Sequence, residues 1–154
     1  MCGDIESEEQ LVPGLTLAHY CDGQIAVYKL GLVTESALTA WEDHVIARLE
    51  RWPSPFPYRA LHDLSDRQVG LSFAIKVKFD LFNLAVTPNG RVRAAALTEP
   101  PFQAEIALVF NQDTSGYLGQ TYTLHQKPEA SNIQYKVFFT FQTALDWLAE
   151  GVNG

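Results

Sequence analysis

His62, Asp63 and Ser65 lie within four consecutive positions, and they are the residue types of a nucleophilic triad. Ser72 is a second candidate for the serine. In a triad the histidine accepts the proton of the serine hydroxyl, and the carboxylate orients the imidazole ring. The chain lacks the Gly-x-Ser-x-Gly sequence that presents a nucleophilic serine on a strand-to-helix turn. We therefore prefer chance composition to hydrolysis as the interpretation of this group.

The sequence also gives no clear pattern for a metal site, a phosphate site or an acid–base pair. His19 and Cys21 could both bind a metal, but they adjoin a turn, and no paired spacing among the other histidines completes a tetrahedral site. Glu99, Glu105 and Asp113 have no identifiable partner that would shift their pKa values. No glycine-rich loop suited to phosphate follows a clear strand. We expect no metal, no cofactor and no enzymatic activity.

The composition predicts one folded domain. With 154 residues, 47% hydrophobic and 19% charged, the chain can bury one core. Its net charge of -7 argues against a nucleic-acid partner. No apolar run could span a membrane, and the acidic N-terminus does not look like a signal peptide. The two cysteines, Cys2 and Cys21, predict free thiols in a reducing compartment, so we expect a cytoplasmic protein.

Several elements follow from hydrophobic periodicity and turn signals. Residues 15–20 and 24–30 predict a hairpin around Asp22-Gly23. Thr34 should cap a helix that ends before Pro53. Residues 58–64 and 133–139 predict strands, and Thr140 should cap a second helix. The apolar stripe of that helix is expected to contain Phe141, Ala144, Leu145 and Leu148.

The middle of the chain is less regular. Residues 72–86 fit either a strand or a helix, and we favour the helix. We predict a turn at 88–90, a strand at 91–98, and a helix whose stripe contains Phe102, Ile106, Val109 and Phe110. Residues 112–132 show no clear element. A helix at 72–86 would have two apolar faces, and the second would lie near other aromatic residues. The preferred interpretation is core, and the alternative is an apolar pocket or interface formed by Ile75, Phe79, Phe82, Val86, Phe102 and Phe110.

Val137-Phe138 followed by Ala144-Leu145-Asp146-Trp147-Leu148 resembles the closing strand and helix of SpoIIAA-like proteins, also called STAS/SEC14-like domains. Residues 31–34, 63–65 and 91–97 also look like marks of that family in the expected order. The resemblance implies a single α/β domain over residues 15–150, and the acidic composition of residues 1–14 predicts a flexible segment before it. It implies a mixed, mostly parallel sheet of about five strands with about four helices. Some members of the wider group are phosphorylated on a serine, whose counterpart by position is Ser72.

Two functions follow as hypotheses. The first is a non-enzymatic, STAS-like regulatory or protein-interaction module that acts through helix faces and forms a homodimer through an apolar patch. The alternative is a binding module that holds a small apolar or lipid-like ligand between the predicted helix at 72–86 and the predicted helix that contains Phe102 and Phe110, as the SEC14-like resemblance suggests. An uncharacterised enzyme comes third.

Overall fold

The computed structural model describes residues 4–53, 56–67, 69, 87–112 and 132–153. Six strands and three helices follow one another in the described residues. They are β1 (Ser7–Val12), β2 (Leu15–Tyr20), β3 (Ile25–Leu30), α1 (Glu35–Glu50), β4 (Tyr58–Leu64), α3 (Pro88–Leu97), β5 (Ala104–Phe110), β6 (Ile133–Phe138) and α5 (Phe141–Asn153). No helix in these ranges is both long enough and apolar enough to cross a membrane.

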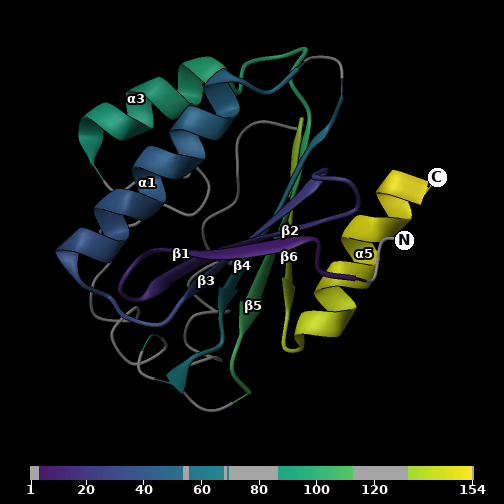
Figure 1. Ribbon diagram of the computed structural model, residues 1–154. Coiled ribbons are helices and arrows are strands. Elements are labelled where there is room, and N and C mark those ends of the chain that lie inside the picture. The colour runs from purple at the N-terminus through teal and green to yellow at the C-terminus, as the bar shows by residue number, and fades with distance from the viewer. Residues whose placement is uncertain (1–3, 54–55, 68, 70–86, 113–131, 154) are drawn as a thin grey trace.

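All six strands form one sheet in the order β1-β2-β3-β4-β5-β6. The first two pairings are antiparallel, and the three from β3 to β6 are parallel. Helices α1 and α3 lie together on one side of the sheet and α5 lies on the other (Figure 1). We call these sides the α1 face and the α5 face. The prediction of an α/β domain with a mixed, mostly parallel sheet is confirmed, with one strand more than expected.

Helix α1 begins and ends where its sequence predicts. The Thr34 hydroxyl accepts a hydrogen bond from the Ala37 amide at 3.1 Å and thereby satisfies a donor of the first turn. Trp41, Val45 and Leu49 recur at helical spacing and are buried against the sheet. The caps and the apolar stripe therefore define the same helix.

Residues 88–97 form helix α3, so the predicted turn at 88–90 and strand at 91–98 are wrong. The Thr87 hydroxyl accepts from the Gly90 amide at 3.0 Å, and Pro88 occupies the first turn. The Glu42 carboxylate on α1 accepts from the Thr87 amide at 2.8 Å and from its hydroxyl at 2.9 Å. A proline after a capping threonine starts a helix, and the alanines that follow favour its continuation.

Residues 104–110 form strand β5, so the predicted helix with a stripe of Phe102, Ile106, Val109 and Phe110 is also wrong. Ile106 and Phe110 belong to the core on the α1 face, whereas Val109 packs on the α5 face. The alternating side chains of β5 thus pack into the cores on both faces of the sheet. A strand buried on both sides is a continuous apolar run, which periodicity cannot distinguish from a buried helix.

Strand β1 lies in the segment 1–14, to which the sequence analysis assigned no strand. It pairs with β2 at the edge of the sheet, with Glu8 opposite Ala18 and Glu9 opposite Leu17. Both glutamates are exposed, and charged side chains are common on edge strands because they discourage pairing with another chain. The acidic composition that suggested a segment outside the sheet is thus compatible with an edge strand.

The turn at residues 21–23 joins β2 to β3 as the Asp-Gly pair predicts. Cys21, Asp22 and Gly23 have φ angles of 57°, 55° and 77°, which a tight hairpin requires. Cys21 is buried and disulfide-bonded, which contradicts the expectation of free thiols. The chain's other cysteine, Cys2, lies outside the described residues. The cysteines therefore give no support for a reducing compartment.

Strand β6 and helix α5 confirm the strongest sequence pattern. The Thr143 amide donates to the Thr140 hydroxyl at 3.3 Å at the start of the helix. Ala144, Leu145 and Leu148 are buried against the α5 face of the sheet. One side of α5 therefore supplies most of its contact with the strands.

Leu145→Ala should lower the free energy of unfolding by about 2–5 kcal/mol, because it truncates a side chain that is 2% exposed. Chemical denaturation of wild type and variant measures the change. Glu150→Ala, at an exposed position of the same helix, is the control and should leave the midpoint nearly unchanged. Equal midpoints for Leu145→Ala and wild type would contradict the assignment of the buried stripe.

Candidate functional site

Strand β4 directs His62 and Asp63 to opposite faces of the sheet, because successive side chains of a strand alternate. His62 belongs to the α1 face, where it contacts Trp41 of α1. Asp63 lies on the α5 face, and its Oδ1 accepts from the Ser65 amide at 3.0 Å and from the Ser65 hydroxyl at 2.5 Å. The strand therefore separates the imidazole from the Asp63–Ser65 pair. His62, Asp63 and Ser65 do not form a triad, and Ser72 lies outside the described residues.

His62 is a fully buried residue of the core. The Trp41 indole N–H donates to its Nδ1 at 3.0 Å, and its ring stacks on Tyr28 with centroids 5.4 Å apart. Since Nδ1 accepts, the proton of the neutral ring is on Nε2, which has no hydrogen-bond partner among the residues that the structure describes. Burial lowers the pKa of His62 to about 3. The ring therefore stays neutral near pH 7 and supports the packing of α1.

His19 and His44 lie beside Arg48 and do not form a metal site. His19 Nδ1 is 3.0 Å from the Ser7 hydroxyl, and its Nε2 is 3.5 Å from Arg48 Nη1. Burial, and then the Arg48 charge, lower the pKa of both histidines. A guanidinium at this distance also repels a metal cation. Across the part of the chain that the structure describes, no three metal-binding side chains come together.

A cavity of about 310 Å³ opens on the α5 face over β2, β3 and β4. This volume is near the lower limit for small-molecule sites. Its wall includes Phe141 at the start of α5 and Tyr20 at the end of β2, whose ring centroids are 6.1 Å apart. Ile5 and Glu8 line the side toward β1.

The floor of the cavity consists of two parallel rows of side chains that cross the strands. The strand register aligns the polar row Thr16, Lys29 and Asp63, and the apolar row Ala18 and Val27. Because neighbouring residues on one face are two positions apart along each strand, the rows are separated by about 7 Å. The cavity thus has a polar end, which lies toward the carboxyl ends of β3 and β4, and an apolar end.

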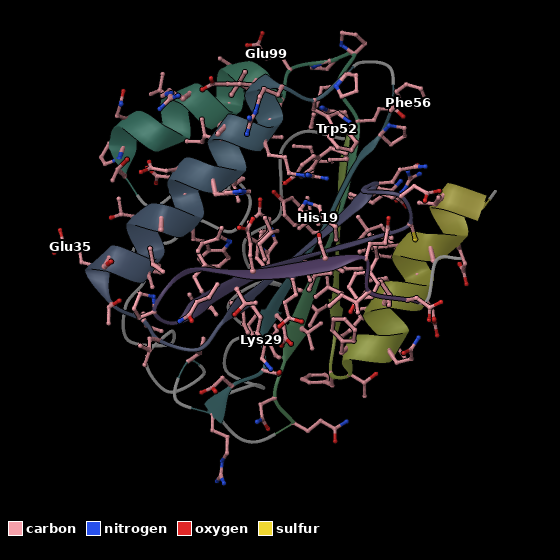
Figure 2. All side chains as sticks on the ribbon, in the orientation of Figure 1. His19, Lys29, Glu35, Trp52, Phe56 and Glu99 are labelled. Carbon is pink, nitrogen blue, oxygen red and sulfur yellow. The ribbon has the colours of Figure 1, made fainter. Side chains whose placement is uncertain are left out.

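The polar row contains one cation and one anion that do not neutralise each other by direct contact. Asp63 is 7% exposed, whereas Lys29 is exposed. They are opposite each other in the register, but no ion pair joins them in the described part of the structure. Figure 2 shows Lys29 and His19 on opposite sides of β1, so the Lys29 row and the His19 cluster are separate features.

A second cavity, of about 370 Å³, lies near the amino ends of β4 and β5 and is polar. Its main charged groups are Arg59 and Glu105, which form an ion pair at 2.8 Å. A side chain at Gly151 would approach both groups within 3.0 Å, so α5 packs closely over them. The pair satisfies its own charges and supports α5. Glu105, for which no partner was identified in the sequence, thus has Arg59.

The residues predicted to line an apolar pocket are not brought together by the described structure. Phe110 is 1% exposed in the core of the α1 face, and Phe102 packs beside Tyr58 with ring centroids 6.1 Å apart. Both lie away from the cavity on the α5 face. The other four predicted residues, Ile75, Phe79, Phe82 and Val86, lie outside the described residues, as does His125. Lys29 was missed, although it is a charged position in an otherwise apolar strand, and Asp63 was considered only as a member of a triad.

Comparisons with protein-family models, with curated proteins and with solved structures give no match. The resemblance to SpoIIAA-like proteins therefore stays a prediction.

The stability of the protein should fall as the pH decreases from 7 to 5, in part because of His62. Its folded pKa of about 3 is below its unfolded value of 6.5, so the unfolded chain binds the proton first. Considered alone, neutral His62 contributes its full share of the free energy of unfolding above pH 6.5. At pH 5 that contribution is about 2 kcal/mol smaller. Urea denaturation at both pH values measures the loss.

The variant His62→Asn is the control, because it retains an acceptor for Trp41 but cannot titrate in this range. Its stability should change less between pH 7 and pH 5 than that of the wild type, by about the same 2 kcal/mol. The same pH dependence in both proteins would show that His62 is not held neutral by burial.

Proposed function

We propose that this chain is a non-enzymatic binding module for a small, largely apolar molecule. The observation that carries the proposal is the cavity on the α5 face, in which Ala18 and Val27 form an apolar floor beside Phe141. Small-molecule sites are typically apolar hollows with a few polar groups that orient the ligand. Thr16, Lys29 and Asp63 are such groups. The proposal assigns no reaction to the chain.

A cytoplasmic location is part of the proposal, although the disulfide bond of Cys21 removes the support that the cysteines gave it. The regulatory role implied by the SpoIIAA-like resemblance is also kept as a proposal. In that role, occupation of the cavity would be the signal that the module reports.

Titration of the labelled protein with neutral 2-phenylethanol, followed by two-dimensional amide NMR, tests the binding function. The amide signals of Ala18, Val27 and Phe141 should shift and saturate together, because the aromatic ring displaces water from the apolar end of the cavity. Thr16→Trp should abolish the shifts, since an indole at this partly exposed position fills the cavity.

The matched control is Gln134→Trp, an exposed position on the same face of β6, outside this cavity. It should bind 2-phenylethanol as the wild type does. Shifts that do not saturate, or that are the same in wild type and Thr16→Trp, would contradict a binding function for this cavity.

A protein-interaction module that forms a homodimer is the second candidate. The observation that favours it is the outer side of α3, where Val92 is 70% exposed beside the exposed Ala95 and Ala96. The interface residues first proposed, from Ile75 to Val86, lie outside the described residues. Native mass spectrometry separates the two candidates. A retained small molecule on a monomer supports the binding module, and a ligand-free dimer supports the interaction module.

A further inference from the structure

We infer that the cavity on the α5 face takes a small zwitterion with an apolar side chain, of the kind that a free α-amino acid represents. This inference rests on the proposed binding function and specifies its ligand. It follows from the arrangement of charges at the polar end and of apolar groups beside them.

The polar row has the two charges that a zwitterion requires. Asp63 Oδ1 is already occupied by the Ser65 amide and hydroxyl, and its other oxygen, Oδ2, has no hydrogen-bond partner among the described residues. Lys29 and the Thr16 hydroxyl are next in the same row. Strand spacing places the side-chain attachment points of adjacent members about 5 Å apart. A ligand ammonium can therefore face Asp63 while its carboxylate faces Lys29 and Thr16.

A ligand with a single charge fits this row less well. An amine without a carboxylate would pair with Asp63 and lie beside the Lys29 cation. A carboxylate without an amine would pair with Lys29 and lie close to Asp63, which is 7% exposed. Asp63 is nearly buried, so its repulsion of a ligand carboxylate is weakly screened by water, whereas the repulsion of an ammonium by the exposed Lys29 is screened more strongly. A zwitterion pairs both charges and adds no net charge to the cavity.

The apolar row determines what else the ligand carries. Ala18 and Val27 lie about 7 Å along the strands from the polar row. Both are small, so they leave room for the side chain of the ligand. Tyr20 and Phe141 form the aromatic wall at this end. Burial, and then the Glu8 charge, raise the pKa of Tyr20, so its phenol stays neutral. The apolar end therefore suits a large apolar side chain, such as an aromatic ring.

Isothermal titration with three matched probes tests the inference. L-phenylalanine has both charges, 2-phenylethylamine has only the amine, and 3-phenylpropionate has only the carboxylate. We expect phenylalanine to bind about 10-fold more tightly than either of the other two probes. Each of them lacks one charged hydrogen bond, and a 10-fold change in affinity corresponds to about 1.4 kcal/mol of binding free energy. Equal or tighter binding of a singly charged probe overturns the zwitterion.

Two variants assign the charges. Lys29→Gln should remove the advantage of phenylalanine over 2-phenylethylamine, and Asp63→Asn should remove its advantage over 3-phenylpropionate. Lys29 is exposed, so its variant is interpretable even if Asp63→Asn folds poorly. Lys136→Gln, an exposed lysine on the same face of β6, is the control and should bind as the wild type does. An unchanged preference in Lys29→Gln contradicts the assigned orientation.

The outcomes also separate this inference from the function on which it rests. If 2-phenylethanol binds in the cavity and phenylalanine has no advantage over the other charged probes, the binding function stands and the zwitterion is wrong. If neither 2-phenylethanol nor any of the three charged probes binds, the proposed function itself is wrong.

Discussion

The extent of α5 over the sheet is the constraint on which the candidate site depends. Six strands span about 24 Å from first to last, whereas one helix with its side chains is about 10–12 Å wide. On the α5 face, α5 is the helix that the described residues provide, and it packs over β4, β5 and β6 (Figure 1). Toward β2, Phe141 at the start of α5 contacts Tyr20, and this contact marks the boundary of the helix over the sheet. The cavity with Lys29 and Asp63 lies at that boundary, beside Phe141.

The alternating direction of the side chains along β4 determines which of its charged groups lies in the cavity. Asp63 reaches the cavity because His62 occupies the opposite face, where Trp41 and Tyr28 hold it in the core. The same alternation separates the residues that resemble a triad in the sequence. Strand β4 thus places a neutral histidine against α1 on one face and a carboxylate in the cavity on the other face. The first stabilises the fold, and the second contributes to the proposed site.

The sequence predicts this fold well where one face of an element is polar. Helices α1 and α5 have one apolar side and a capping threonine each, Thr34 and Thr140, and both were predicted. The failures occur where that contrast is absent. Strand β5 is apolar on both sides, β1 is an acidic edge strand, and α3 begins with a Pro-Asn-Gly sequence typical of a turn. The cavity could not be predicted, because it depends on the register that aligns Lys29 with Asp63 across two strands.

The most direct test of the account is the position of a bound ligand. Isotope-filtered NMR of the labelled protein with L-phenylalanine measures which methyl groups lie within about 5 Å of the ligand ring, since nuclear Overhauser effects are limited to short distances. The account predicts contacts from the ring to the methyl groups of Ala18 and Val27, which belong to the α5 face. Contacts to Leu15 or Leu30, which belong to the opposite face, or no contacts at saturating ligand, would contradict it.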